Sequence, residues 1–349
     1  VAVGALGRGA PFKECVTHGW TVDGEGKAMH KSLGNGMDPA EIFDKYGADL
    51  LRLWAGSADY HVDVRCSDEI FKQLSQNYLK FRNTCKFCLD NLVGFDADHL
   101  VQPDEMLPLD KWAVTRLNTL IEKVFAAYDN YEFHVVSHMV NDFCVVDLSS
   151  FYFDIIKDRL YCGEENSLER RSAQSAVWMI LDAMTRLFAP ILAFTCDEVW
   201  LAMPHRAGDD ARNVLLNQMV QPYAAYALSE EEMGKWARLA ALRTAVNGAL
   251  EQARADKTIG KSLEAEVDLT VTAEDAFLTD MDAADLADLL IVSQVRVEVG
   301  AELTVAVRPA NGAKCLRCWK VLPTVGSDAG HPDLCPRCAA VVKNLPVIE

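Results

Sequence analysis

The sequence predicts a mainly α-helical protein that has two smaller regions with β-strands and ends in a cysteine-rich module. Three observations support this prediction: a long middle stretch whose apolar residues recur with the period of a helix, shorter stretches that alternate as strands do, and two Cys-x2-Cys pairs near the C-terminus. The chain has 349 residues, half of them hydrophobic, so we expect two or three domains with cores of their own.

The first sixty residues predict a strand, a loop and a helix. Residues 12–22 alternate and are rich in β-formers, and residues 23–36 form a loop that contains glycines and lysines. A helix is then expected from residue 39 to about residue 55. Its start is indicated by Asp38 as N-cap, Pro39 at the first helical position and Glu41 at the capping-box position.

The long middle stretch, from residue 68, predicts a helical bundle, followed by a small α/β module after residue 222. Bundle helices are expected at about residues 133–160, 167–189 and 194–203, besides one in which Trp112, Leu117, Leu120, Ile121, Val124 and Tyr128 fall near a 3.6-residue period. The module is expected to contain helices at 230–254 and 283–289 and strands at 264–271, 291–298 and 302–307.

Charge and composition narrow the functional classes. A net charge of −17 argues against a protein that binds nucleic acid through its overall charge, although local basic patches remain compatible with it. No apolar stretch approaches the roughly 18–20 residues that span a bilayer. The chain has no export signal, so its 11 cysteines indicate a reduced cytosol rather than a disulfide scaffold. Because the first residue is Val, we expect a piece cut from a longer protein.

Four cysteines near the end of the chain predict a structural zinc site. Cys315 and Cys318 form one Cys-x2-Cys pair, and Cys335 and Cys338 form a second after 16 intervening residues. Each pair directs two sulfurs at one point, and two pairs complete a tetrahedron with no open position for catalysis. The alternative is four unconnected cysteines. Basic residues surround the motif and suit a phosphate-facing surface, although they also suit an ordinary solvated one: Arg308, Lys314, Arg317, Lys320, Arg337 and Lys343.

The loop Met29-His30-Lys31-Ser32-Leu33-Gly34-Asn35 is a candidate phosphate-binding loop. It lies between the expected strand and the capped helix, and a lysine on a glycine-containing loop beside a helix N-terminus can hold a polyphosphate. Spacing alone favours a plain surface turn about equally.

Three parts of the chain resemble one family. One part is similar to the KMSKS region of the class I synthetases for isoleucine, valine and leucine: THGWTVDGEGKAMHKSLGNGMDPAEIFDKYGADLLRLW. Two segments resemble the anticodon-binding domain of isoleucyl-tRNA synthetases: NDFCVVDLSSFYFDIIKDRLYC and RRSAQSAVWMILDAMTRLFAPILAFTCDEVW. The C-terminal end of those enzymes is similar to DKTIGKSLEAEV followed by KCLRCWK and LCPRC. The resemblance begins at about Pro11, and the first ten residues do not match well.

The resemblance implies roles for residues of the loop. Aligned with Lys-Met-Ser-Lys-Ser, the chain reads Ala28-Met29-His30-Lys31-Ser32, so the second lysine is kept as Lys31 and the first is replaced. Lys31 would be the catalytic residue that stabilises charge on the ATP phosphates during adenylate formation. The implied ATP-binding residues are Lys31, Ser32, Met29, His18 and Gly19. Ala28 puts ATP affinity in doubt, and Lys27 could take the place of the missing lysine.

The resemblance also implies an organisation and partners. Four domains are expected: the end of a Rossmann-like α/β catalytic domain at 1–60, a helical anticodon-binding domain at 61–228, a small α/β module at 229–310 and a zinc knuckle at 311–349. The full-length enzyme is expected to be a cytoplasmic monomer that binds isoleucine, isoleucine tRNA and ATP with Mg as substrate. Because the family's His-Ile-Gly-His motif is missing from the sequence, the chain alone is not expected to aminoacylate.

Exposed cationic residues are candidate tRNA contacts, since they can meet phosphates and stack on bases. These are Lys80, Arg82, Lys86, Arg170 and Arg171 in the helical stretch and Arg317 and Lys320 in the knuckle, and a solvated helix face is the alternative for each helical residue. Other residues are expected to lie in the core instead: Cys85, Cys88, His134, His138, Phe151, Phe153 and Trp178.

Three alternatives remain beside an isoleucine–tRNA ligase segment. A valyl or leucyl enzyme is disfavoured by the knuckle, because the C-terminal ends of those enzymes look different. A stand-alone tRNA-binding protein derived from a synthetase would explain the altered loop. A DNA-repair glycosylase shares a similar knuckle, but its N-terminal catalytic proline and β-sandwich have no counterpart in this sequence.

Overall fold

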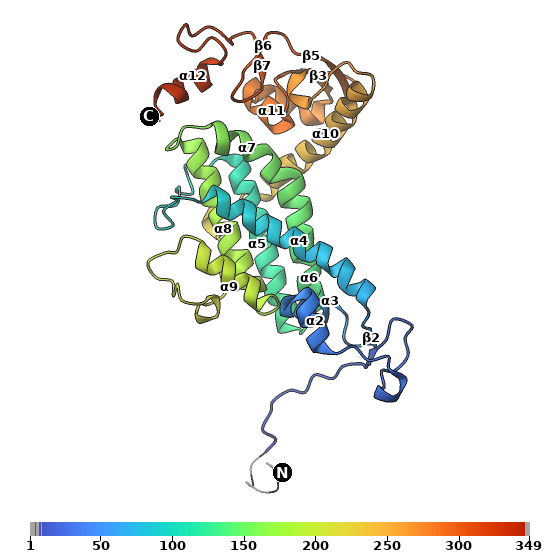
Figure 1. Ribbon diagram of the computed structural model, residues 1–349. Coiled ribbons are helices and arrows are strands. Elements are labelled where there is room, and N and C mark those ends of the chain that lie inside the picture. The colour runs from blue at the N-terminus through green and yellow to red at the C-terminus, as the bar shows by residue number, and fades with distance from the viewer. Residues whose placement is uncertain (1–3, 5–6, 8, 346–349) are drawn as a thin grey trace.

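The computed structural model describes residues 4, 7 and 9–345. A helical bundle forms the middle of the molecule (Figure 1). The N-terminal segment extends from one end of the bundle, while the α/β module and the knuckle lie at the other end, above α7. The expected mainly helical architecture is confirmed.

The N-terminal region combines a short parallel sheet with two helices. Strand β1 (Thr21–Val22) pairs in parallel with β2 (Val64–Arg65). Between them lie the short 3-10 helix η1 (Lys31–Leu33), α2 (Pro39–Tyr46) and α3 (Ala48–Ser57). The candidate phosphate loop therefore connects β1 to α2, as the sequence predicts.

Two predictions for this region need correction. The strand expected at residues 12–22 is formed only at its end. Its partner β2 is two residues long, so only Thr21 and Val22 are paired. The single helix expected to residue 55 is two helices, which meet at Gly47 with φ of 83°. Asp38 does cap α2, since its carboxylate accepts the Ala40 amide hydrogen at 2.9 Å, but no capping box with Glu41 is formed there.

The bundle is organised around α8 (Leu168–Phe188), in which residues 172–185 are all buried. Trp178 on α8 is fully buried, and Phe151 and Phe153 are also core residues, as expected. The other bundle elements are α4 (Asp68–Asn91), α5 (Pro108–Asp129), α6 (Phe133–Asp142), the π-helix η2 (Phe143–Tyr152), α7 (Phe153–Cys162) and α9 (Ala193–Ala202). The helix expected at 133–160 is therefore present but has a π-helical middle.

The α/β module has the elements that the sequence predicts. Its central strand β3 (Ala265–Val271) pairs in parallel with β4 (Gln294–Val299) and antiparallel with β5 (Thr304–Pro309). Helices α10 (Glu230–Ala255) and α11 (Ala283–Leu290) pack against β5 and β4 respectively. The inward side chains of β3 are fully buried, so the sheet and the two helices share one core. Short 3-10 helices complete this part of the chain: η3 (Val214–Leu216), η4 (Ala224–Tyr226), η5 (Ser262–Glu264) and η6 (Ala273–Asp280).

The knuckle consists of a two-stranded ribbon and a helix. Strands β6 (Ala313–Lys314) and β7 (Val321–Leu322) pair antiparallel, and α12 (Pro336–Lys343) follows. Cys335 occupies the N-cap position of α12. The cysteine-bearing loop is thus fixed at both ends by secondary structure.

The core predictions hold for Cys85, Cys88, Phe151, Phe153 and Trp178 but not for the two histidines. Cys85 and Cys88 are each 1% exposed, and burial raises the pKa of both thiols well above the usual value. His134 is half-buried, whereas His138 is exposed and is not a core histidine, because it faces outward from α6. Among the described residues, no helix is both long and apolar enough to cross a membrane.

Candidate functional site

The candidate phosphate loop is held closed by Asp23 and Asn35. The Asp23 carboxylate accepts the amide hydrogens of Glu25 and Lys27, and the Asn35 amide donates to the second Asp23 oxygen at 2.8 Å and to the Ala28 carbonyl at 3.1 Å. The Asn35 side-chain oxygen also accepts the His30 amide hydrogen at 2.9 Å. Because these hydrogen bonds stabilise the carboxylate, they lower the pKa of Asp23.

The loop side chains divide into an anchored residue and exposed ones. Met29 is half-buried against a small cluster around Ile42 and Phe71. His30 and Ser32 are exposed and hydrogen-bonded to each other at 2.7 Å. Lys27 points to Glu25, with a nitrogen–oxygen distance of 2.7 Å. The backbone of Lys31 opens η1, but its side chain lies outside what the structure describes.

His18 and Gly19 lie where β1 approaches the segment before β2. The Gly19 amide donates to the Tyr60 carbonyl at 2.8 Å, and a Cβ at Gly19 would lie 2.3 Å from the Val62 carbonyl oxygen. Glycine is therefore required here by the close approach of two backbones. The exposed His18 ring hydrogen-bonds through Nδ1 to the Gly19 carbonyl at 2.6 Å.

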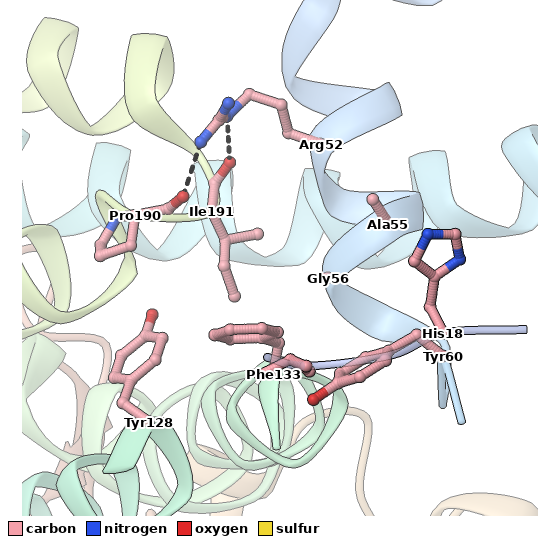
Figure 2. Close-up of a pocket in the computed structure, with 10 residues that line it drawn as sticks. His18, Arg52, Ala55, Gly56, Tyr60, Tyr128, Phe133, Pro190 and Ile191 are labelled. Atoms are coloured by element: carbon pink, nitrogen blue, oxygen red, sulfur yellow. Dashed lines mark hydrogen bonds between the residues drawn. The ribbon is translucent and has the colours of Figure 1, made fainter. Parts of the chain in front are cut away.

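His18 also borders a crevice of about 510 Å³ between the N-terminal segment and the bundle (Figure 2). The polar groups around it are already used: Arg52 donates to the carbonyls of Pro190 and Ile191, and the Tyr128 hydroxyl donates to the Leu187 carbonyl. Apart from His18 and Tyr60, the remaining lining is apolar and includes Phe133 and Ile191. The crevice is therefore mainly apolar, and Arg52, Tyr128 and His18 each hydrogen-bond to backbone carbonyls of the protein.

Helix α3 connects the loop region to the bundle. The buried Asp49 carboxylate accepts hydrogen bonds from the amides of Phe194 and Thr195 and from the Thr195 hydroxyl, and thereby caps α9. Arg52, one turn later, binds the two carbonyls just before α9. The position of α3, and through Gly47 that of α2, is thus fixed relative to the bundle.

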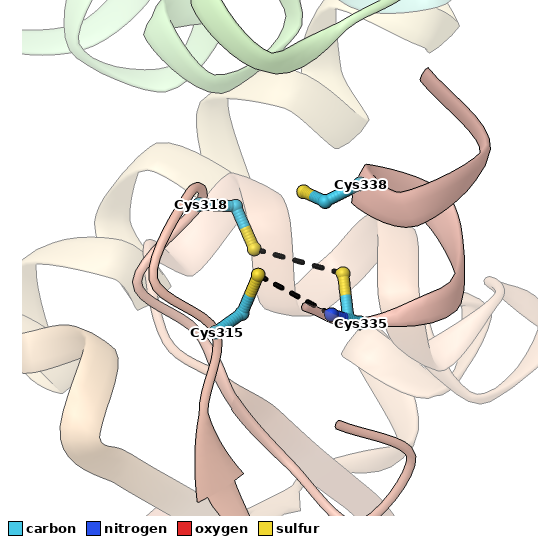
Figure 3. A group of neighbouring side chains, drawn as sticks. All are labelled: Cys315, Cys318, Cys335 and Cys338. Atoms are coloured by element: carbon cyan, nitrogen blue, oxygen red, sulfur yellow. Dashed lines mark hydrogen bonds between the residues drawn. The ribbon is translucent and has the colours of Figure 1, made fainter. Parts of the chain in front are cut away.

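The four predicted zinc ligands meet at one point in the knuckle (Figure 3). Their sulfurs all lie within 4.8 Å of one another, and the four residues are buried. The sulfurs of Cys318 and Cys335 are 3.9 Å apart. A tetrahedral zinc ion with about 2.3 Å bonds to sulfur requires sulfurs about 3.8 Å apart. The cluster therefore fits a structural zinc that leaves no position for a substrate.

Backbone hydrogen bonds prepare the cluster for a metal. The Cys335 amide donates to the Cys315 sulfur at 3.4 Å. Burial raises the pKa of Cys315, but the backbone amides of Cys318, Cys335 and Arg317 together outweigh burial and lower it to about 6. The thiolate is the form that binds zinc, so these amides favour the ligating form of Cys315, whereas burial raises the pKa of Cys318 and Cys335.

The predicted tRNA contacts lie in different surroundings. Lys80, Arg82 and Lys86 are exposed along α4, where Lys86 also pairs with Asp90 at 2.7 Å. Arg170 and Arg171, at the start of α8, are only partly exposed. Arg171 donates to the side chains of Asn166 and Gln174. The α4 residues are thus the more accessible group.

The two knuckle residues predicted to contact tRNA instead make contacts inside the protein. Lys320 is buried and pairs with Asp288 on α11. Arg317 is half-buried and donates to the carbonyls of Cys162 and Tyr161 at the end of α7. In this conformation neither side chain is presented to RNA.

An aromatic residue that the sequence did not single out lies beside them. Trp319 follows Cys318, has φ of 65° and is 56% exposed. The Lys261 ammonium lies 5.6 Å from its ring centre, and the neighbouring Leu316 is 64% exposed. Its position directly after a predicted zinc-ligand turn is the sequence signal that could have identified it.

Family comparisons agree with this arrangement of sites. Residues 2–67 match the class I tRNA synthetases for I, L, M and V, and residues 110–269 match the anticodon-binding domain of tRNA ligases. Residues 312–341 match the zinc finger found in FPG and IleRS. The matches thus fall on the candidate loop, the bundle and the knuckle.

Curated relatives identify the family. The isoleucine–tRNA ligase of Geobacter sulfurreducens is 45% identical over 348 residues, which cover 96% of this chain. Those of Moorella thermoacetica and Desulforamulus reducens are 44% and 46% identical and cover 99% and 95% of the chain. The chain belongs to the isoleucyl-tRNA synthetase family. It spans 37–38% of the length of these relatives.

A solved ternary complex of the leucyl-tRNA synthetase agnB2 from Agrobacterium radiobacter K84 with tRNA and LeuAMS is also similar. It shares 16% identity and a TM-score of 0.47, and the match covers 89% of this chain and 30% of that one. The family assignment depends on the isoleucine–tRNA ligases and not on this likeness. Neither a valyl or leucyl enzyme nor a stand-alone tRNA-binding protein is favoured by these comparisons.

Proposed function

We propose that this chain is the part of an isoleucine–tRNA ligase that supplies the ATP-phosphate loop and much of the tRNA-binding surface. In the whole enzyme, the isoleucine carboxylate attacks the α-phosphate of ATP, pyrophosphate leaves, and the activated isoleucine is transferred to its tRNA. The observation that carries the proposal is the 44–46% identity to isoleucine–tRNA ligases over 95–99% of the chain. The reaction would take place in the cytoplasm, with a monomeric enzyme and Mg-bound ATP.

The loop would act by positioning charge. Lys31 would place its ammonium against the phosphates as negative charge develops on them, with Met29, Ser32, His18 and Gly19 shaping the nucleotide site. The Asp23–Asn35 hydrogen bonds support this role, because a loop that is already ordered needs less reorganisation when ATP binds. No His-Ile-Gly-His sequence occurs in the 349 residues, so the chain by itself is not expected to form the adenylate.

The missing first lysine of the loop gives a direct test. Ala28 is exposed, and its contacts with Val22 and Asn35 are made through its backbone, so a longer side chain can be accommodated there. In the whole enzyme, Ala28→Lys is expected to raise the rate of isoleucine-dependent pyrophosphate exchange by about tenfold, the effect of one added charged interaction of about 1.4 kcal/mol. Lys27→Ala tests the alternative that Lys27 takes the place of the missing lysine, in which case the exchange rate would fall although Lys27 pairs with Glu25 in this conformation. An unchanged exchange rate in Ala28→Lys would mean that the loop works without a first lysine.

The RNA surface would combine the α4 cations with the exposed edge of the knuckle. Lys80, Arg82 and Lys86 can neutralise phosphates, and Trp319 beside Lys261 offers a face on which an unpaired base can stack. Because the whole chain carries a charge of −17, binding must depend on such local groups. Arg170 and Arg171 would contribute at the start of α8.

Binding of the 349-residue chain to isoleucine tRNA, with valine tRNA as control, tests this proposal across a salt series. We expect a preference for isoleucine tRNA, and a lower salt slope when Lys80, Arg82 and Lys86 are changed to Ala, by about one unit for each phosphate that is no longer neutralised. Lys235→Ala serves as the control, because Lys235 is an exposed cation on α10 that pairs with Glu231. Equal binding of both tRNAs would reject this chain as the specificity-bearing part.

A further inference from the structure

The knuckle lies across the joint between the bundle and the α/β module. On the bundle side, Arg337 of α12 makes a two-pronged ion pair with Asp158 of α7, with nitrogen–oxygen distances of 2.5 and 2.9 Å. Asn344 adds a hydrogen bond to Glu164 at 3.3 Å. The planar guanidinium matches a carboxylate in this geometry, so the pair fixes orientation as well as distance.

Arg317 connects the metal cluster itself to the end of α7. Its guanidinium donates to the Cys162 carbonyl at 2.5 Å and to the Tyr161 carbonyl at 3.4 Å. The same nitrogen that contacts Cys162 lies 3.8 Å from the sulfur of Cys338. The last carbonyls of a helix lack partners within the helix and favour a cation, so Arg317 completes the C-terminus of α7.

The opposite side of the knuckle holds the α/β module. Lys320 pairs with Asp288 on α11, and the Val321 amide donates to the Ser293 hydroxyl at 2.7 Å. The Gln294 side chain, at the start of β4, donates to the carbonyls of Val321 and Asn311 at 3.0 and 2.7 Å. The knuckle therefore contacts both the bundle and the α/β module.

The cationic residues that make these contacts lie within or beside the Cys-x2-Cys turns, so the zinc ligands determine their positions. Arg317 lies between Cys315 and Cys318, Arg337 lies between Cys335 and Cys338, and Lys320 follows Cys318 by two positions. The backbone of a Cys-x2-Cys turn is fixed by its metal, and a short loop with little core of its own loses that order when the metal leaves. Removing zinc would thus weaken the contacts of the knuckle with the bundle and with the α/β module together.

Direct packing across the joint is incomplete. A cavity of about 500 Å³ is lined by residues of α7, α11 and the knuckle, among them Ile155, Asp288 and Trp319. A second connection does not involve the knuckle: Arg243 of α10 donates to the carbonyls of Ser150 and Leu289 and to the Asp154 carboxylate, each at 3.1 Å. The joint would therefore loosen without the knuckle, but would not separate.

We propose that zinc in the knuckle fixes the orientation of the α/β module on the helical bundle. The metal-loaded knuckle is a clamp in which Arg317 and Arg337 hold the end of α7 and Lys320 holds α11. The role of zinc then extends beyond folding its own loop, because it orders a surface built from three parts of the chain. This inference concerns the chain alone and does not depend on RNA binding.

Hydrogen–deuterium exchange of the zinc-loaded chain, before and after chelation, tests the clamp without RNA. We expect exchange to rise about tenfold or more at residues 158–164 and 288–294, outside the knuckle, while the buried amides of α5 and α8 keep their protection. Small-angle scattering should show a larger radius after chelation. Faster exchange confined to residues 311–345, with an unchanged radius, would overturn the proposal.

Substitutions separate the contacts of the clamp from metal binding. Arg337→Ala and Arg317→Ala are expected to retain one zinc per chain, measured by colorimetric release, and yet to raise exchange at the end of α7. Arg238→Ala is the matched control, because its ion pairs with Glu274 and Asp275 lie within the α/β module. The double change Asp158→Arg with Arg337→Asp should restore protection. Zinc-loaded variants with unchanged exchange at α7 would also overturn the proposal, and chelation of the unaltered chain remains decisive if a variant loses zinc.

Discussion

The phosphate loop and the zinc knuckle are both short loop-rich segments, but they are completed in different ways. All four candidate ligands of the knuckle come from one stretch of this chain and surround a single point. The candidate phosphate loop is ordered by Asp23 and Asn35, and its residues His30, Ser32 and Leu33 are exposed. The knuckle thus holds a complete set of metal ligands, whereas in our proposal the loop supplies only one side of a nucleotide site.

The two regions also differ in what holds them in place. Besides its cluster of four cysteines, the knuckle has ion pairs that anchor it to α7 and α11. The N-terminal region depends on a two-residue ladder and on α3, and it exposes Phe12, Val16 and Trp20 at 62%, 47% and 79%. Exposed apolar side chains of this size are typical of surfaces that pack against another domain.

The largest expected effect is the loss of a zinc ligand. Cys318→Ser is expected to abolish stoichiometric zinc binding and to unfold residues 311–345, because the metal supplies about 10–16 kcal/mol in small zinc modules. Zinc content and exchange of the knuckle amides measure both consequences. Cys15→Ser is the control, since Cys15 is exposed and far from the cluster in sequence. A knuckle that keeps its protection in Cys318→Ser would show that its ion pairs, and not its metal, hold it together.

Gly19→Ala tests the ladder that holds the loop region. The added Cβ would lie 2.3 Å from the Val62 carbonyl oxygen, so β1 and β2 must move apart. We expect a loss of about 1–3 kcal/mol in local stability, measured by exchange of the amides that pair across β1 and β2.

The matched glycine for this test is Gly234 on α10, where an added Cβ meets no atom within 4 Å. Gly234→Ala is expected to stabilise the helix by about 0.5–1 kcal/mol. If Gly19→Ala were as harmless as Gly234→Ala, the short ladder would not be what positions the phosphate loop.

The sequence predicts those features whose causes are local. The cysteine spacing, the cap at Asp38 and the alternation of β3 all depend on residues close in the chain, and the structure contains each of them. The extent of β1 could not be predicted, because it depends on β2, more than forty residues away. The π-helix η2 follows no distinct pattern, since its residues are apolar on several faces.

The knuckle cations show the same limit for site residues. Their basic character is visible in the sequence and suggests contact with phosphate. Arg317 instead finds carbonyls 155 residues away, and Lys320 finds a carboxylate 32 residues away. Partners at such distances are decided by how domains pack, which a single sequence does not reveal.

The smallest expected effect concerns pH and the loop. Hydrogen bonds, first that from Asn35, lower the pKa of Asp23 below its ordinary value of 3.8. A carboxyl whose pKa is lower in the folded state stabilises that state above pH of about 4, and this contribution is lost as pH falls through the folded pKa. The loop should therefore loosen in acid before the bundle does, with faster exchange at the Lys27 and His30 amides.

Asn35→Ala sharpens this last test, because it removes the largest cause of the shift. The pKa of Asp23, followed by NMR of its carboxyl carbon, should rise toward 3.8, and the acid loosening of the loop should begin at a higher pH. Asp210 is the internal control, since Arg212 lowers the pKa of Asp210 to about 2 at a site unrelated to the loop. A shift of both carboxyls in Asn35→Ala would indicate a global change, whereas a shift of neither would mean that Asn35 does not order the loop in solution. A shift of Asp23 alone would identify Asn35 as the residue that keeps the candidate phosphate loop ordered. Asn35 would then do for the loop what zinc does for the knuckle.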